Sequence, residues 1–310
     1  MFPPASDFMK SLYLFSLILS SHFIRSEPVK ILLRGNLSPS LIKNIVQDYG
    51  HQAVAIMLSC NGVILNYAFV MYNKSISKID IVQNIAKELP VPPVMSYFLC
   101  DCWYVSEKII NTFAERGFHT IGALKTNRIL YPFGIKKKLN EFAALLSVTH
   151  SDFHLVIVKN QTYYVYRYEG KLNGVENAVV LLSYPEKAFG NPKALRAFLS
   201  TDVSLSTDKI LSYYVCRWPI EIFFRQCKDK LALDSYQIRS AQRIRRFWLL
   251  MSLAHFMCVA GPGEIGSFKN GYCQICDIIQ LEKYHYPFLF SLLSSRSRFC
   301  KLPHLKYFPQ

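Results

Sequence analysis

The feature that most constrains the fold is an alternation of strand-like and helix-like segments between Val94 and Leu124. A short apolar run over 94–100 is followed by a helical apolar period over 105–116 and a second strand-like run over 118–124. Strands joined by a helical crossover pair in parallel, because a tight hairpin cannot make this connection. The sequence therefore predicts an α/β fold with a parallel strand pair.

Two further strand-like runs precede this unit, at residues 52–59 and 63–72. The Asn61-Gly62 pair between them favours a tight hairpin turn. Residues 77–89 show a helical apolar period, with Ser75 or Ser77 as the expected N-terminal cap. The predicted order is strand, strand, helix, strand, helix, strand.

The segment from about residue 125 to 205 has a different character. Three strand-like runs, "HLVIVKN", "TYYVYRYEG" and "NAVVLLSYP", follow one another at short intervals. They predict a mostly antiparallel β subdomain inserted before the next helix, which is expected to start near Ser206 or Thr207. Residues 240–260 predict a second long helix, and residues 261–310 a basic, aromatic tail.

Charge and cysteine content narrow the class of protein. The formal net charge of +15 favours a polyanionic partner, most often nucleic acid. The nine cysteines are odd in number and mostly isolated, which favours a reducing cytoplasm. The apolar run at residues 11–24 is too short to span a bilayer, so no membrane association is expected. The apolar run at residues 11–24 fits a buried strand as well as a secretion signal, so secretion stays a minor alternative. Cys273 and Cys276 form a CxxC in a turn-like setting but lack two further zinc ligands nearby.

The stretch "YYVCRWPIEIFFRQCK" carries an unusual polar stripe. Tyr214, Arg217, Glu221, Arg225 and Lys228 follow one another at intervals of three or four residues, which predicts one face of a helix. One carboxylate therefore stands among four groups that can hold a phosphate. Pro219 is expected to kink this helix or to mark a restart.

Asp101 is the second acid of interest, because it follows an apolar strand at the edge where ligands gather in α/β sheets. Asp101 and Glu221 together suggest ligands for magnesium or manganese, since carboxylate oxygens suit such ions. Two plainer readings stay open: Asp101 as the cap of the next helix, and Glu221 as an ion-pair partner of Arg217 or Arg225.

At these residues the sequence resembles a known family. Tyr214, Arg217, Glu221 and Lys228 match the pattern Y-x2-R-x3-E-x6-K, which resembles the YREK signature of bacterial insertion-sequence transposases of the type-four family. That family carries a DDE active site on a ribonuclease H-like fold. "LCDCWY" resembles the strand of its second aspartate, and "GALKTNR" the strand and turn that follow. The resemblance covers residues 49–258.

The resemblance implies a fold, roles and partners. It implies a ribonuclease H-like mixed sheet with flanking helices and an inserted β subdomain. Asp101 and Glu221 would be the second and third catalytic acids and the metal ligands. Tyr214, Arg217 and Lys228 would contact DNA near the cleaved transposon end, with Arg225 as a further DNA-binding group. The implied partners are transposon ends and target DNA, bound by a homodimer.

The first acid of such a triad is missing from its expected place. It should lie around residues 12–21, yet Ser16 or Leu17 stands where an aspartate is expected. We therefore expect residues 1–48 to be a divergent segment, truncated or frame-shifted, ahead of a transposase domain at 49–260. Two functions remain: a degenerate DDE transposase with impaired activity, or a non-catalytic nucleic-acid-binding protein derived from the same fold.

Overall fold

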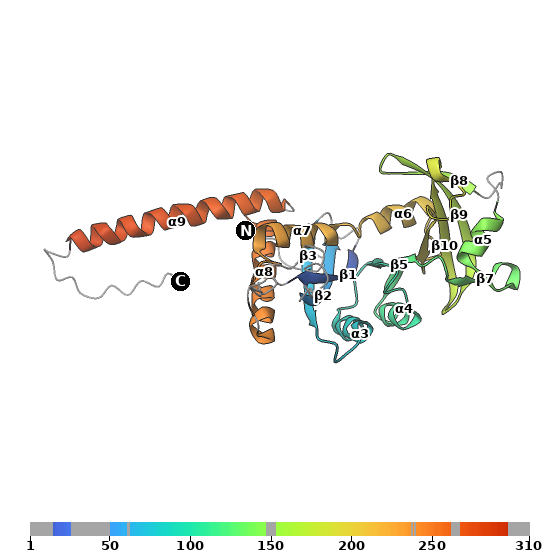
Figure 1. Cartoon of the computed structure of the whole chain (residues 1–310), viewed down its shortest axis with the longest axis horizontal. Coiled ribbons are helices and arrows are strands. Elements are labelled where there is room, and N and C mark those ends of the chain that lie inside the picture. The colour runs from blue at the N-terminus through green and yellow to red at the C-terminus, as the bar shows by residue number, and fades with distance from the viewer. Residues whose placement is uncertain are drawn as a thin grey trace, which may run out of the picture. The chain divides into compact units, whose positions relative to one another are not determined.

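The computed structural model describes residues 15–25, 50–60, 63–146, 153–236, 238, 240–261 and 267–296. The chain divides into two compact units, residues 1–254 and 255–310. The boundary falls inside helix α8 (Ala241–Ala260). The first unit contains the sheet and the helices that cover its two faces (Figure 1).

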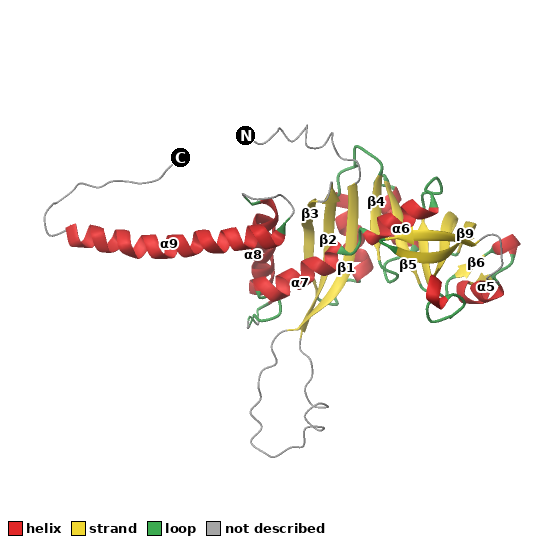
Figure 2. Cartoon of the chain, turned by 90° about the horizontal axis from the view of Figure 1, so that it is seen from above, coloured by secondary structure: helices red, strands yellow, loops and turns green. Residues whose placement is uncertain are grey.

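One mixed sheet of eleven described strands organises the first unit (Figure 2). The strand order is β3-β2-β1-β4-β5-β11-β10-β9-β6-β7, and β8 pairs with β9 outside this path. The strands are β1 (Phe15–Arg25), β2 (Gly50–Cys60), β3 (Val63–Tyr72), β4 (Ser96–Cys100), β5 (Phe118–Leu124), β6 (Ile129–Leu130), β7 (Lys137–Lys138), β8 (Phe153–Val158), β9 (Gln161–Leu172), β10 (Val175–Pro185) and β11 (Arg196–Ser200).

The pairing confirms the predicted fold class, an α/β mixed sheet with flanking helices. β1, β4 and β5 are parallel neighbours, and β2 and β3 form the expected antiparallel pair. The strands of the inserted region, β8 to β11, pair antiparallel with one another. They also continue the main sheet, because β11 pairs antiparallel with β5.

The helices begin close to the predicted capping residues. Ser77 caps the first described helix with its side chain, and Ser106 caps the second in the same way. Ser206 is the N-cap residue of the helix predicted to start near it. These three helices are α3 (Lys78–Glu88), α4 (Glu107–Ala114) and α6 (Thr207–Val215), and the structure also describes the α-helices α5 (Leu139–Leu145), α7 (Pro219–Leu231) and α9 (Phe268–Arg296).

Two hydrophobic cores lie on opposite faces of the sheet. Side chains of a strand alternate between faces, so Phe98 and Cys100 of β4 join one core and Tyr97 and Leu99 join the other. The first core also contains residues of α3 and α4, and the second contains residues of α6, α7 and α8. By the same alternation, the position after Cys100 belongs to the face covered by α6 and α7.

The second unit, residues 255–310, contains the end of α8 and all of α9. His255 is buried here and its ring stacks on Phe268, with centroids 4.9 Å apart. Cys273 and Cys276 lie inside α9, so the turn-like setting predicted for this CxxC is wrong; a helical apolar period explains the segment better. In the part of the chain that the structure describes, no helix is both long and apolar enough to cross a membrane.

Candidate active site

Asp101 directly follows β4, at the end predicted from the sequence. Its carboxylate Oδ1 accepts a hydrogen bond from the Trp103 backbone N–H at 2.9 Å, which shapes the turn after the strand. The cap of α4 is a different residue, Ser106, so the reading of Asp101 as a helix cap is wrong. Within the described residues, Oδ2 of the half-buried Asp101 makes no hydrogen bond. This oxygen can therefore accept a ligand.

The polar stripe predicted on one helix is divided between two helices. α6 ends at Val215 and α7 begins at Pro219, which occupies the first helical position. The connection is a tight turn, in which the N–H of Arg217 bonds to the carbonyl of Tyr214 three residues earlier. Proline supplies no N–H and disfavours a continuous α-helix before it, so the expected restart at Pro219 is confirmed while the single stripe is wrong.

Glu221 lies in the first turn of α7 and pairs with Arg217. The Arg217 Nη1 and Glu221 Oε1 atoms are 3.2 Å apart, with side-chain exposures of 15% and 32%. The guanidinium of Arg217 also lies 5.8 Å from the ring centre of Tyr214. The plainer reading of Glu221 as an ion-pair partner of Arg217 therefore holds for this protein without a bound ligand.

The electrostatics connect Asp101 to this group. Burial raises the pKa of the Tyr214 hydroxyl, the positive charge of Arg217 opposes that rise, and the charge of Asp101 adds to it. Burial likewise raises the pKa of the Cys100 thiol, with Asp101 adding to the rise and Arg217 opposing it. Asp101 and Arg217 thus act on the same two groups, and Glu221 joins them through its ion pair with Arg217.

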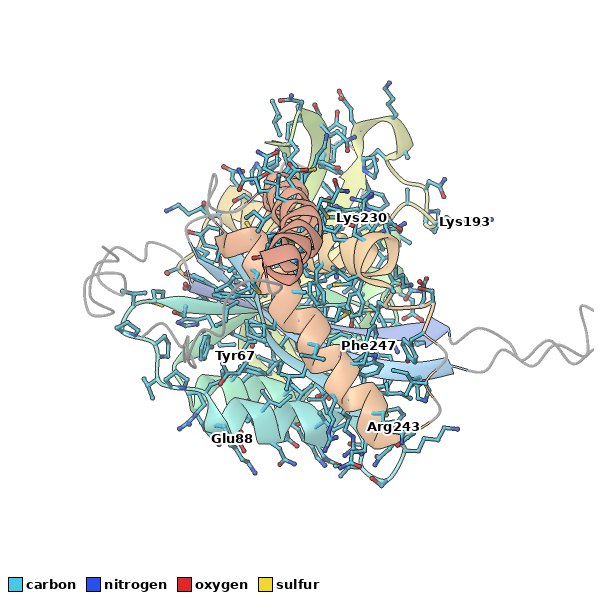
Figure 3. All side chains as sticks on the ribbon, turned by 90° about the vertical axis from the view of Figure 1, so that its left-hand side faces the viewer. Tyr67, Glu88, Lys193, Lys230, Arg243 and Phe247 are labelled. Carbon is cyan, nitrogen blue, oxygen red and sulfur yellow. The ribbon has the colours of Figure 1, made fainter. Side chains whose placement is uncertain are left out.

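Two further cations predicted to bind DNA lie farther along α7. Arg225 is exposed, and Lys228 is half-buried in the last turn of the helix. Lys228 comes seven residues after Glu221, which is about two turns or roughly 10 Å along the axis on the same side of the helix. Lys230, at the end of the helix, is labelled at the surface in Figure 3.

The backbone register shows which residue of β1 lies beside Asp101. β1 and β4 are parallel, and their last described pair is Leu19 with Cys100. One residue further on each strand are Ser20 and Asp101, so the position beside Asp101 is Ser20 rather than Ser16 or Leu17. α7 contacts β1 as well, which places the helix of Glu221 over this strand.

The donor set offers two carboxylates and no complete metal cage. In the described ranges no three His, Cys, Asp or Glu side chains cluster as a metal site. Magnesium and manganese take oxygen ligands and readily keep waters, so two carboxylates with an open oxygen on Asp101 fit such an ion. Glu221 becomes available to an ion only if it exchanges the Arg217 partner for it.

One buried acid was missed by the sequence reasoning. Asp202 follows β11 and is 6% exposed, and its Oδ2 accepts a hydrogen bond from the Tyr97 hydroxyl at 2.9 Å. Tyr97 precedes Asp101 by four strand residues, about 13 Å, so Asp202 cannot share a ligand with Asp101. The Asp-x-Ser spacing at residues 202–204 is typical of a turn and was the available signal.

The mixed sheet with helices on both faces is consistent with a ribonuclease H-like fold. A family model of the transposase DDE domain matches residues 47–257, more than half of the chain. The chain therefore belongs to the transposase DDE domain family. No curated protein was found to match it.

Proposed function

We propose that this protein is an insertion-sequence transposase of the type-four, YREK-bearing kind, acting on DNA in the cytoplasm through a degenerate DDE site. The main support is that both acids are linked to the same two residues within the matched region: Asp101 acts electrostatically on Tyr214, and Glu221 pairs with Arg217, whose guanidinium lies beside the Tyr214 ring. The family implies DNA as the partner. A homodimer on paired transposon ends is part of the proposal.

In this proposal Asp101 and Glu221 hold a magnesium or manganese ion, which when bound supplies Lewis acidity at the phosphodiester and an activated water. Arg217, released from Glu221, would offset negative charge on the phosphate. The exposed Arg225 and the half-buried Lys228 would contact the DNA backbone along α7. The Tyr214 hydroxyl, whose pKa burial raises, stays protonated and can donate to a phosphate oxygen.

The proposal that the DDE site is degenerate depends on the residue that β1 places beside Asp101. Ser20 stands beside Asp101 in the register, where the family's first acid is expected, and a hydroxyl is a poor substitute for an ionised carboxylate. With two acids instead of three, we expect weak metal binding and severely impaired strand cleavage. The alternative, a non-catalytic DNA-binding protein, is favoured by the same observation and by the Arg217–Glu221 ion pair.

Restoring the missing acid tests the proposal directly. We expect Ser20→Asp to tighten Mn²⁺ binding at least tenfold by calorimetry, and to produce magnesium-dependent nicking of DNA that carries the element's ends. Ser21→Asp, one residue along β1, is the matched control because successive strand residues alternate between faces. EDTA should remove the nicking, as should Asp101→Ala or Glu221→Ala added to Ser20→Asp.

The two candidate functions give different results in this experiment. If Ser20→Asp neither binds Mn²⁺ more tightly nor nicks, while salt-sensitive DNA binding persists, the protein is a non-catalytic binder. If Ser21→Asp restores nicking as well as Ser20→Asp does, the assignment of the site to the register beside Asp101 is wrong.

A further inference from the structure

The outer edge of β3 is open. β3 stands at one end of the strand order, and within the described ranges no strand pairs with its outer side. The central residues of its neighbour β2, 53–57, are fully buried, whereas residues 64–72 of β3 are half-buried or exposed. Free backbone N–H and C=O groups along such an edge can pair with another extended chain.

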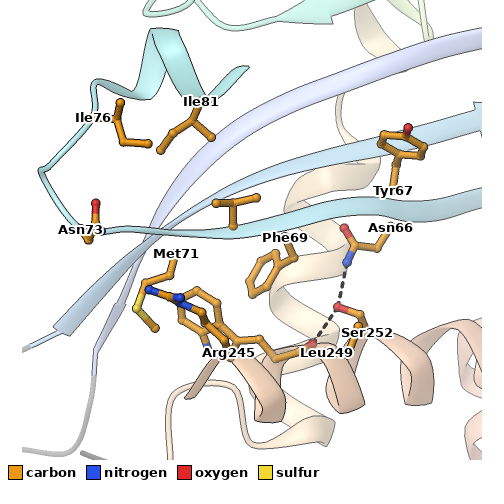
Figure 4. Close-up of a pocket in the computed structure, with 12 residues that line it drawn as sticks. Asn66, Tyr67, Phe69, Met71, Asn73, Ile76, Ile81, Arg245, Leu249 and Ser252 are labelled. Carbon is orange, nitrogen blue, oxygen red and sulfur yellow. Dashed lines mark hydrogen bonds between the residues drawn. The ribbon is translucent and has the colours of Figure 1, made fainter. Parts of the chain in front are cut away.

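A groove of about 500 Å³ follows this edge and has walls on both faces of the sheet (Figure 4). Ile76 and Ile81 line it on the side of α3, and Trp248 and Leu249 line it on the side of α8. The Phe69 ring packs on Trp248 with ring centres 4.8 Å apart. The groove runs from Asn66 to Asn73, about 20 Å at the rise of a strand, which accommodates about six extended residues.

Polar groups stand at the two ends of the groove. Near one end, Asn66 Nδ2 donates to Ser252 Oγ at 2.8 Å, while Asn66 Oδ1 is buried with no hydrogen-bond partner among the described residues. At the other end Arg245 lies beside Met71 (Figure 4). Arg245 is the one ionised residue among the twelve that line the groove, and no acid lines it. The groove thus has a cation at one end, whereas the unpaired acceptor of Asn66 at the other end is buried.

We propose that the open edge of β3 binds an extended peptide from another protein by strand addition, with apolar side chains at alternate positions and a carboxylate at the Arg245 end. Backbone pairing with β3 supplies affinity, and the two apolar walls select side chains on both faces of the added strand. This site is distinct from Asp101 and Glu221 and does not depend on the proposed catalytic function.

Other occupants fit the groove less well. A nucleic-acid backbone would place phosphates against Ile76, Ile81 and Leu249 with one cation to compensate, which is unfavourable for a desolvated charge. β3 of a second copy contains no acid for Arg245.

Fluorescein-labelled hexapeptides that alternate valine and threonine, with a glutamate at one end or the other, serve as probes. We expect one of the two orientations to bind measurably by fluorescence anisotropy and to slow hydrogen exchange at the amides of β3. Two N-methylated versions of the peptide, each methylated on alternate residues, test the pairing. The version whose methyl groups lie on the edge that pairs with β3 should not bind, and the other version should bind normally, because only one edge of an added strand pairs with β3.

Charge reversal at the groove has a matched control on the same helix. We expect Arg245→Glu to weaken binding of the glutamate peptide at least tenfold, and to create binding of the same peptide ending in lysine. Arg246→Glu, at an exposed residue that does not line the groove, should change the affinity for neither the glutamate peptide nor the lysine peptide by more than twofold. Leu249→Ser should weaken binding, whereas Leu250→Ser, 64% exposed and outside the groove, should not.

Several results would overturn the proposal. These are no binding of either peptide at 1 mM, equal losses in Arg245→Glu and Arg246→Glu, or equal effects of the two methylation patterns. Competition by duplex DNA that is lost in Arg245→Glu would assign the groove to nucleic acid. Concentration-dependent protection of β3 without peptide, together with a dimer by light scattering, would assign it to a second copy.

Discussion

A buried carboxylate connects the strand of Asp101 to the segment that leads into α6. Asp202 accepts hydrogen bonds from the Tyr97 hydroxyl and from both the N–H and the hydroxyl of Ser204. Burial alone would raise the pKa of this carboxyl, but the hydrogen bonds lower it below its ordinary value. The Tyr97 ring in turn packs on Tyr213, the residue before Tyr214 of the site. Asp202 is therefore linked through Tyr97 to Tyr213 of α6.

Removal of the Tyr97 hydroxyl tests this connection. We expect Tyr97→Phe to lower the free energy of unfolding by about 1–3 kcal/mol at neutral pH, since a buried carboxylate loses a donor. A carboxyl with a lowered folded pKa stabilises the fold above its unfolded pKa and loses that contribution as the pH falls through the folded value. The difference in the free energy of unfolding between Tyr97→Phe and the unmodified protein should therefore become smaller in acid. Urea unfolding from pH 7 to pH 3 measures it. Tyr213→Phe is the control, and an equal loss there would contradict the assignment.

At the scale of elements, the segment between β4 and α4 approaches Gly122 of β5 closely. A Cβ added to Gly122 of β5 would lie 2.5 Å from Val105 Cγ2 and 3.0 Å from the Cys100 sulfur. Cys100 is the residue before Asp101, and Val105 lies in the segment that leads from Asp101 to α4. The glycine thus lets the Asp101 turn and α4 settle against the sheet.

We expect Gly122→Ala to destabilise the protein by about 1–3 kcal/mol, because a packed core must move to admit the methyl group. The combination Gly122→Ala with Val105→Ala should lose less than the sum of the two single changes, since the second removes the nearest clashing atom. Thermal unfolding of the three variants measures this coupling. Strict additivity would show that Val105 does not confine Gly122.

The sequence predicted the local elements better than their junctions. The run 118–124, the cap Ser77 and the helix start near Ser206 or Thr207 depend on nearby residues, and the structure confirms them. The single helical stripe was wrong, because spacing alone does not show that the chain tightens at Cys216–Trp218 before Pro219. The groove beside β3 could not be predicted, since it joins residues near 70 to α8, far along the chain. The roles of Asp101, Glu221 and the four DNA-binding candidates stay predictions.

At the scale of the whole molecule, acid should act on the two units through different groups. Burial lowers the pKa of His255, in the second unit, to about 4. The unfolded chain binds this proton below about 6.5 and the folded chain does not, so stability falls as the pH drops from about 6.5 to about 4. Asp202, in the first unit, loses its contribution only at lower pH.

We expect roughly 3 kcal/mol of pH-dependent destabilisation from His255 across that window. Urea unfolding followed through the helical signal at pH 7, 6, 5 and 4 measures it. His255→Gln should reduce the dependence over this range and leave the part due to His51, whose pKa is also lowered by burial, whereas His154→Gln, at an exposed residue, should leave it unchanged. A dependence that is not reduced in His255→Gln would assign the acid sensitivity to another group.

The pairing of β11 with β5 also sets the order in which the protein can be completed during synthesis. The edge of β5 at Leu124 is covered only when Ala197 of β11 pairs with it, and the strands of the insertion lie between these two residues in the chain. Closing so large a loop makes this a slow, late step of folding. Glu221 leaves the ribosome later still. Asp101 therefore leaves the ribosome 120 residues before Glu221, and a chain that ends before Glu221 lacks one of the two acids.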